Sequence, residues 1–193
     1  MKAREAVFTV VDFETTGAVK GWPEEPWQIG VVEVRAGEVG DVRDEAWLRV
    51  APGRPFNRYA PGRWSQVRGE LAVAETLAGS WPRWRGWFEG RWVVAHNAGT
   101  ERKVLSRAAP MMKVAGWIDT LALARRALPG LGDWSLGKVA TATGADRVAE
   151  ERCPGRTWHD AFFDATATAA FLSWLLAQDG WRELDAEMLG DIR

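Results

Sequence analysis

The chain has 193 residues, enough for one well-buried domain and too few for two comfortable ones, so we expect a single domain over residues 1–193. Lysine and arginine number 25 against 26 aspartate and glutamate, and the formal net charge of -1 excludes the global basic field of a non-specific DNA-coating protein. A single cysteine excludes an internal disulfide, and the absence of a signal-peptide or membrane-spanning pattern leads us to expect a cytoplasmic protein with no membrane partner.

The first predicted element is a buried strand that leads into two acids. The apolar run from Ala6 to Val11 is typical of a central strand, and Asp12 and Glu14 follow it. Residues two apart on a strand point to the same side, about 6.6 Å apart, so these carboxylates could share a cation. Taken alone, the pattern has a simpler interpretation, in which the strand ends at Val11 and both acids are solvated in a turn.

The next part of the chain predicts an antiparallel meander followed by a long loop. Residues 18–26 are a loop, strands are expected at 27–35 and 42–50, and a glycine-rich turn at 36–41 joins them. Prolines and glycines mark residues 51–67 as irregular. Loops of this length are usually functional or mobile, so we expect this one to flank a substrate groove.

The second half of the chain alternates strands with helices, which implies parallel pairing and a mixed sheet with helices on both faces. Ser80 and Pro82 predict a helix start, and Gly90 predicts its end. Asn97 and Thr100 are candidate caps for a later helix. Short strands are expected at 91–95 and 117–119, and helices at 100–108, 120–128, 135–143 and 181–192.

A polar segment at 144–158, in which Cys153-Pro154-Gly155 excludes regular structure, leads to His159 and a long helix. Residues five apart in a continuous helix diverge by about 140°, so a helical His159 would not face the same site as Asp164. We therefore expect Asp160 to cap the helix, with His159 on the loop before it. Asp164 would then lie near the first turn, where the helix dipole favours its ionised form.

Three motifs follow one another along the chain: Asp-Phe-Glu-Thr-Thr-Gly at 12–17, Val-Val-Ala-His-Asn-Ala-Gly-Thr-Glu at 93–101, and His-Asp-Ala-Phe-Phe-Asp-Ala at 159–165. In this order and combination they resemble the DEDDh exonucleases, which include the proofreading subunit of bacterial DNA polymerase III, ribonuclease T and oligoribonuclease. The resemblance extends from Val7 to about Leu176. It implies a ribonuclease-H-like α/β fold with five strands in the order 3-2-1-4-5. The middle motif departs from the family pattern, because Glu101 stands where Asp is usual.

The resemblance also implies a reaction, the release of nucleoside 5′-monophosphates from 3′ ends by two-metal phosphodiester hydrolysis. Four carboxylates would hold two Mg²⁺ or Mn²⁺ ions: Asp12, Glu14, Glu101 and Asp164. Oxygen ligands of this kind favour hard cations over zinc. His159 would be the catalytic general base that takes the proton from the attacking water.

Substrate-binding roles come from the same resemblance and fall to Phe13, Thr15, Thr16, Gly17, His96 and Asn97. For His96 and Asn97, structural roles as a satisfied loop histidine and a helix cap stand slightly ahead. Asp119 resembles another metal ligand but matches a family position that is structural.

Two other functions stay open. One is a catalytically weak module that binds 3′ ends or another protein, which the departure at Glu101 would permit. The other is an RNA-specific exoribonuclease, because active-site residues do not decide between RNA and DNA. The expected partner is the 3′ end of single-stranded nucleic acid, and neither a polymerase partner nor an oligomeric state is indicated.

Local affinity for nucleic acid could come from two groups of arginines. One group is Arg54, Arg58, Arg63 and Arg68, and the other is Arg147, Arg152 and Arg156. A solvated loop surface explains them equally well. Most of the thirteen tryptophans, Trp84 and Trp174 among them, are expected in packed positions.

Overall fold

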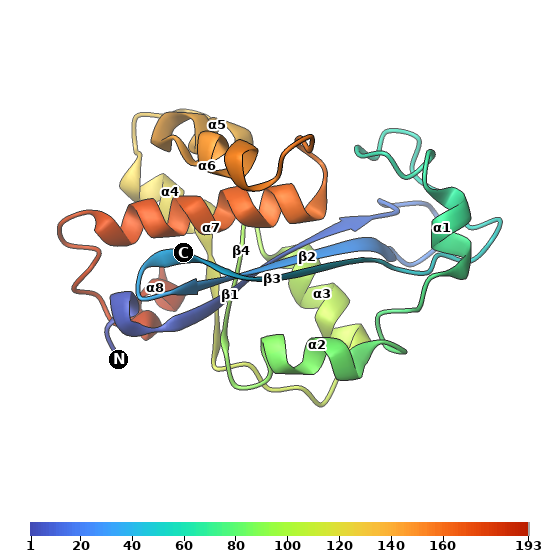
Figure 1. Cartoon of the computed structure of the whole chain (residues 1–193), viewed down its shortest axis with the longest axis horizontal. Coiled ribbons are helices and arrows are strands. Elements are labelled where there is room, and N and C mark those ends of the chain that lie inside the picture. Colours follow the sequence, from blue (N-terminus) through green and yellow to red (C-terminus); the bar gives the residue numbers. More distant parts are fainter. Residues whose placement is uncertain (193) are drawn as a thin grey trace.

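The computed structural model describes residues 1–192, and within that range five strands form one mixed sheet in the order β3-β2-β1-β4-β5 (Figure 1). The strands are β1 (Val7–Thr15), β2 (Pro26–Arg35), β3 (Glu38–Trp47), β4 (Trp92–Ala95) and β5 (Gly116–Asp119). The first three pair antiparallel, whereas β4 lies parallel to β1 and β5 lies parallel to β4. The predicted meander, strand order and ribonuclease-H-like sheet are confirmed.

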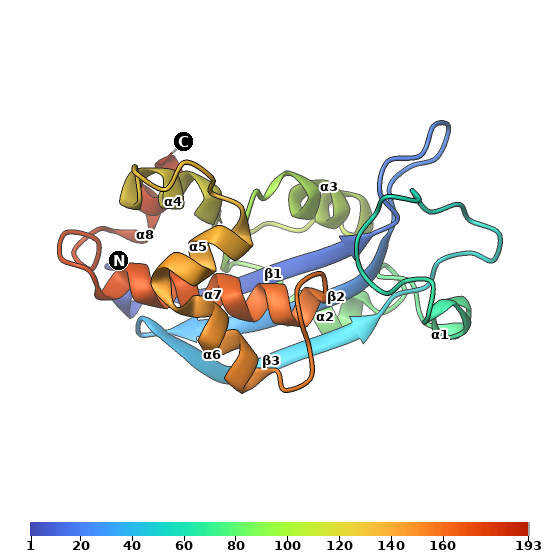
Figure 2. The ribbon, with the colours of Figure 1, turned by 90° about the horizontal axis from the view of Figure 1, so that it is seen from above.

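Helices cover both faces of this sheet (Figures 1 and 2). One face carries α7 (Ala161–Ala177), with α5 (Leu136–Thr143) and α6 (Ala145–Arg152) packed on it, and the other carries α2 (Trp81–Phe88) and α3 (Gly99–Ala108). Shorter pieces are η1 (Ala3–Glu5), α1 (Arg68–Val73), α4 (Thr120–Ala127) and α8 (Ala186–Asp191). Over residues 1–192, none of these helices has the length and apolar character needed to cross a membrane.

Alternate residues of β1 face the two different helical layers. Phe8 and Val10 pack with Phe163 of α7, whereas Val11 packs with Trp84 of α2 on the other face. Burial of each such side chain stabilises the fold by about 1.5–3 kcal/mol relative to exposure. The strand is therefore covered on both faces, as its apolar sequence predicts, and its even-numbered positions point toward α7.

The start of α7 lies unusually close to the sheet because β2 has a glycine beneath it. Gly30 pairs with Asp12 in the antiparallel register. A Cβ built on Gly30 would lie 2.5 Å from the carbonyl carbon and oxygen of Ala161 and from the Cα of Phe162. Any side chain here would push the helix away, so Gly30 fixes the height of the first turn of α7 above the acidic strand.

The turn between β2 and β3 is tighter than predicted. Ala36 and Gly37 both have positive φ, 53° and 78°, which is the geometry of a two-residue hairpin turn. β3 therefore begins at Glu38 and ends at Trp47, and the predicted bounds of 42–50 are wrong. Gly40, which suggested a longer turn, lies within the strand.

Residues 1–192 contain two α-helices, α1 and α6, and one short 3₁₀ helix, η1, that the sequence did not predict. The segment expected to be irregular at 144–158 contains α6, which ends at Arg152, just before Cys153-Pro154-Gly155. Residues 51–67 are irregular as expected, residues 48–50 are irregular as well, and α1 follows this 48–67 loop directly. The helix predicted at 181–192 is shorter, at Ala186–Asp191.

Candidate active site

β1 continues through both carboxylates to Thr15, so the interpretation in which the strand ends at Val11 is wrong. Asp12 and Glu14 share the face of β1 that carries Val10, and both side chains are therefore directed toward α7. Asp12 is partly buried, and Glu14 is only 8% exposed. Two neighbouring carboxylates are thus held beneath the first turn of a helix.

The first turn of α7 contributes a third carboxylate, that of Asp164, and Asp160 caps the start of this helix. The side chain of Asp160 accepts hydrogen bonds from the backbone N–H groups of Phe162 and Phe163 at 3.1 and 3.3 Å, which confirms the predicted cap. Asp164 lies within the first turn. His159 precedes the helix with φ 66°, and its backbone N–H donates to Asp164 Oδ2 at 3.2 Å.

These residues form one compact group with β1. Ligand-type atoms of Glu14, His159 and Asp164 all lie within 4.8 Å of one another. His159 is exposed, whereas Glu14 and Asp164 are buried, so the imidazole stands on the solvent side of the two carboxylates. The loop position that the sequence predicts for His159 thus brings it to the acidic cluster.

Glu101 comes from the first turn of α3, which follows β4. Because β4 lies parallel to β1, the chain leaves both strands at the same edge of the sheet. Glu101 is 4% exposed, and its negative charge is one of those that raise the pKa of Asp12. The four carboxylates that the sequence predicts as metal ligands therefore lie near the same edge of the sheet, and Asp12 is close enough to the other three for their charges to act on it.

The electrostatics of the cluster disfavour four negative charges without a counterion. Burial, followed by the charges of Asp164, Asp160 and Glu101, raises the pKa of Glu14 to about 8. Burial is also the main cause that raises the pKa values of Glu101 and Asp164 to about 7, and it raises that of Asp12 well above its ordinary value. Crowded carboxylates with raised pKa values are typical of functional sites.

Two buried oxygens of the cluster are orphaned, and they test whether a cation fits. Glu101 Oε2 and Asp164 Oδ1 have no hydrogen-bond partner within the described part of the chain, residues 1–192. Buried polar atoms are nearly always partnered, so such exceptions call for a missing ligand. Carboxylate oxygens are the donors that Mg²⁺ and Mn²⁺ prefer, so these residues fit a hard divalent cation.

The predicted substrate residues fall into two groups. Thr15, Thr16 and Gly17 border the cluster at the end of β1, where the Asn57 backbone N–H donates to the Thr16 carbonyl at 2.8 Å. Gly17 has φ 66°, and a Cβ there would lie 2.9 Å from the Asn57 Cβ, so the 48–67 loop packs directly against this turn. The Phe13 side chain packs on the opposite face with Trp84, which leaves its backbone at the site.

The contacts of His96 favour a structural role over the predicted role in substrate binding. The Nδ1 of His96 lies 3.0 Å from Thr120 Oγ1 and its Nε2 lies 2.9 Å from the Trp134 carbonyl oxygen, while burial lowers its pKa. Both ring nitrogens are therefore engaged within the fold. This geometry favours a packed structural histidine over a substrate contact.

The expectation that Asn97 or Thr100 caps α3 through its side chain is wrong. The N-cap position is Ala98, which has no polar side chain, and no side-chain hydrogen bond of the capping kind is found there among residues 1–192. Instead, the carboxylate of Asp119 accepts from the backbone N–H groups of Asn97 and Ala98 at 2.9 and 3.2 Å, and from Leu121 at 3.0 Å. Asp119 thus ties two helix starts together, which suits the structural role expected of it.

Known proteins are similar to this chain in sequence and in fold. The profile of the Exonuclease (RNase T) family matches residues 9–172. Exodeoxyribonuclease 10 of Escherichia coli strain K12 is 29% identical over 185 residues, which cover 95% of this chain and 73% of that protein. The PolC-type DNA polymerase III of Thermotoga maritima is 30% identical over 169 residues, 86% of this chain but 11% of the polymerase.

A solved structure supports the same fold. The nuclease domain of 3′hExo, described as a DEDDh family member bound to rAMP, matches with a TM-score of 0.68 at 14% sequence identity, and the match covers 95% of this chain and 98% of that one. With the family match over most of its length and the acidic cluster in the expected place, the chain belongs to the Exonuclease (RNase T) family and is an exonuclease.

Proposed function

We propose that this exonuclease removes nucleoside 5′-monophosphates from the 3′ ends of single-stranded nucleic acid by two-metal phosphodiester hydrolysis. The observation that carries the proposal is the convergence of Asp12, Glu14, Glu101 and Asp164 with two buried oxygens left without partners among residues 1–192. The sequence left open a catalytically weak binding module, and the family match favours the enzyme.

Each residue of the cluster has a distinct proposed role. The four carboxylates would hold two Mg²⁺ or Mn²⁺ ions, and these ions would supply Lewis-acid chemistry that activates water and stabilises negative charge on the leaving 3′ oxygen. His159 takes the proton from the attacking water, a role worth about 10² to 10⁴ in rate. Its exposed position beside Glu14 and Asp164 lets it pass that proton to solvent.

The surface beside the cluster supports a single-stranded substrate. Tyr59 and Trp22 are 77% and 52% exposed on the two loops that meet next to Gly17. The exposed Arg58 guanidinium lies 4.6 Å from the centre of the Tyr59 ring, and the buried guanidinium of Arg54 packs against the Trp22 ring at 4.9 Å. Exposed aromatic rings with arginine are suited to stacking unpaired bases along a charged backbone.

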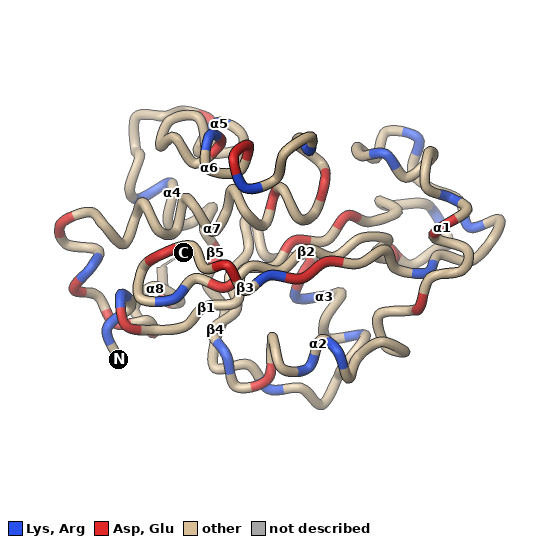
Figure 3. The backbone as a smooth tube through the Cα atoms, viewed as in Figure 1, with Lys and Arg blue, Asp and Glu red and all other residues tan. Residues whose placement is uncertain are grey.

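The distribution of charged residues favours binding of the nucleic-acid strand at one local site over binding by the whole surface. Basic and acidic residues are scattered over the whole tube in Figure 3, and neither sign dominates. Binding therefore depends on cations held at the carboxylates and on the loops near Gly17. The names of exodeoxyribonuclease 10 and the PolC-type polymerase favour DNA, whereas rAMP bound to 3′hExo keeps RNA as the alternative. A cytoplasmic location stays a prediction.

A 5′-labelled single strand tests metal dependence and polarity together. Purified protein should be inactive in EDTA, active again after addition of Mg²⁺ or Mn²⁺, and should shorten the strand stepwise from its 3′ end, because oxygen ligands hold both cations. Matched DNA and RNA oligonucleotides in the same assay decide the substrate class. Robust cleavage in EDTA, or immediate release of the labelled 5′ nucleotide, would refute the proposal.

A further inference from the structure

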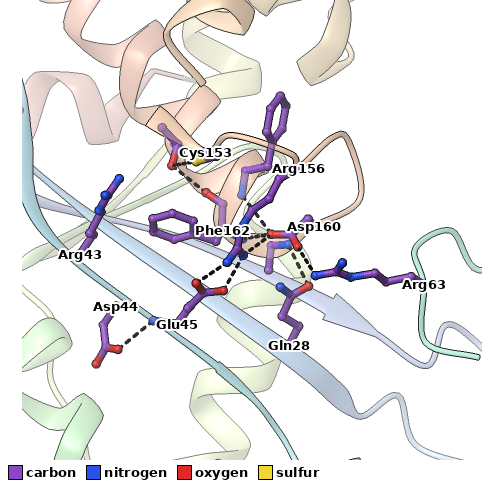
Figure 4. A network of polar contacts seen from close by, with 12 residues as sticks. Gln28, Arg43, Asp44, Glu45, Arg63, Cys153, Arg156, Asp160 and Phe162 are labelled. Atoms are coloured by element: carbon purple, nitrogen blue, oxygen red, sulfur yellow. Dashed lines mark hydrogen bonds and ion pairs between the residues drawn. The ribbon is translucent and has the colours of Figure 1, made fainter. Parts of the chain in front are cut away.

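The carboxylate of Asp160 does more than cap α7, because two arginines hold it (Figure 4). Asp160 is 5% exposed. Its Oδ1 lies 3.0 Å from Arg156 Nη1 and its Oδ2 lies 3.2 Å from Arg63 Nη2. Arg156 reaches it from the segment just before α7, and Arg63 reaches it from the 48–67 loop, 97 residues away in sequence.

One of these arginines anchors the carboxylate to the sheet. Arg156 forms a two-point ion pair with Glu45 of β3, with distances of 2.5 Å from Nη1 to Oε2 and 2.6 Å from Nη2 to Oε1. Its guanidinium lies 5.1 Å from the centre of the Phe162 ring. Paired, planar contacts of this kind fix orientation as well as distance. The Arg156 side of Asp160 is therefore rigid.

The other arginine joins Asp160 to a loop. Arg63 is half-exposed, lies 5.3 Å from the Trp47 ring, and contacts Asp160 through one nitrogen. Its neighbour Gly62 has φ 88°, and a Cβ there would lie 3.1 Å from the carbonyl oxygen of His159. The 48–67 loop thus touches the backbone of His159 and, one residue further along the chain, the carboxylate of Asp160.

The backbone of His159 needs such support. Its φ of 66° lies in the left-handed region, which residues other than glycine rarely adopt and which persists only where surrounding contacts impose it. Three sets of contacts supply this support. The His159 N–H donates to Asp164, and the Asp160 carboxylate forms ion pairs with both arginines. The Ala161 N–H donates to Gln28 Oε1 at 3.1 Å. A change at Asp160 therefore re-aims the imidazole.

We propose that Arg63 is a positioning residue that makes the placement of His159 depend on the 48–67 loop. The same loop packs on Gly17 and carries Tyr59, so it lies where the proposed substrate strand lies. A strand seated on the loop holds Arg63 on Asp160 and the catalytic base over the two carboxylates. This inference rests on the proposed function, since it assigns His159 the role of base.

Arg63→Gln should lower kcat about tenfold and change KM less than about twofold, because it disturbs the base and leaves the substrate surface intact. Arg63→Lys should recover most of kcat, since one charged nitrogen suffices for the contact. The matched control is Arg182→Gln, which removes an arginine as exposed as Arg63 that pairs with Asp179 through one nitrogen beyond the end of α7, and its kcat should be unchanged.

Asp160→Asn separates the ion pairs from the cap, because Asn keeps an oxygen for the N–H groups of Phe162 and Phe163. Combined with Arg63→Gln it should lower kcat no further than Asp160→Asn alone, since Arg63 acts through that carboxylate. A rise in KM with unchanged kcat in Arg63→Gln, or additive effects in the double variant, would overturn the proposal and make Arg63 a substrate contact.

A second readout does not depend on activity. The sequence contains two histidines, His96 and His159, so imidazole NMR signals at fixed pH can be assigned with one variant. Arg63→Gln should shift the His159 signal and leave that of His96 in place, and Arg182→Gln should shift neither. Unmoved signals would refute the positioning role. If the His159 signal moves but the wild type degrades no 3′ end, the proposed function is wrong, whereas the positioning of His159 by Arg63 is supported.

Discussion

Asp164→Asn should abolish measurable turnover and, in EDTA, raise the melting temperature of the protein. Turnover should be lost because the variant removes the charge of a proposed metal ligand that lies beside Glu14 and whose Oδ1 has no hydrogen-bond partner among residues 1–192. Stability rises because an amide of the same shape relieves the repulsion that, with burial, raises the pKa of Asp164 to about 7 and that of Glu14 to about 8. The expected gain is about 2–8 °C, corresponding to about 1–2 kcal/mol.

The same repulsion predicts a pH dependence of the metal-free wild type. The ordinary pKa values of Asp164 and Glu14 are 3.8 and 4.5. When the pH lies above these values, both groups keep protons in the folded state that the unfolded state has lost. Folded protein therefore binds more protons than unfolded protein, and stability falls as pH rises from about 4 to 8. Thermal melts in EDTA should show this fall, and saturating Mg²⁺ should stabilise most at the upper end.

Surface carboxylates paired with arginine titrate in the opposite sense at lower pH, so the comparison is made above pH 5. Asp44 is such a group, since its hydrogen bonds to Arg83 lower its pKa. The matched control is Asp146→Asn, which removes a partly buried carboxylate outside the cluster and should leave the slope unchanged. A melting temperature that rises with pH, or an Asp164→Asn variant less stable than wild type in EDTA, would contradict the account.

Glu101→Gln should lower kcat about 10² to 10⁴-fold at saturating Mn²⁺, because it removes the charge of a buried ligand oxygen that has no other partner among residues 1–192. Glutamate reaches about 1.5 Å further than the aspartate usual in the family, since it has one more methylene. The start of α3 compensates for that length by holding Glu101 at 4% exposure.

Glu101→Asp should keep turnover within about tenfold of wild type, since Mg²⁺ readily retains waters that can bridge the shorter side chain. Steady-state kinetics across a Mn²⁺ titration compare the two variants. The Gln variant should lose kcat, and the Asp variant should chiefly require more metal. Unchanged turnover in Glu101→Gln would show that the cations are held without this residue, and another carboxylate would have to replace it.

The acidic site was predictable because its parts follow local rules. The two-residue spacing of Asp12 and Glu14 requires only a strand, and the position of His159 follows from the cap at Asp160. The sequence does not predict the α6 helix, because Pro154 and Gly155 mark the polar segment as irregular, although both residues lie beyond the last turn of α6 at Arg152.

Contacts made across the fold left no local pattern. Arg63 meets Asp160 over 97 residues, and the two ring contacts of His96 depend on Thr120 and Trp134. Arg54 was expected on a loop surface or a binding face, but it is 2% exposed and pairs with Glu25 at 3.3 Å. Its burial follows from the packing of two loops, which sequence composition does not encode.

The most direct test of metal-dependent hydrolysis at a 3′ end is to identify the product released in ¹⁸O-enriched water. A single strand is incubated with Mg²⁺ and either the wild type or Asp12→Asn, and the released nucleotides are analysed by mass spectrometry. We expect nucleoside 5′-monophosphates carrying one ¹⁸O from the wild type, because water attacks phosphorus and the 3′ oxygen leaves, and none from the variant. Nucleoside 3′-phosphates, unlabelled products, or equal release by Asp12→Asn would contradict the account.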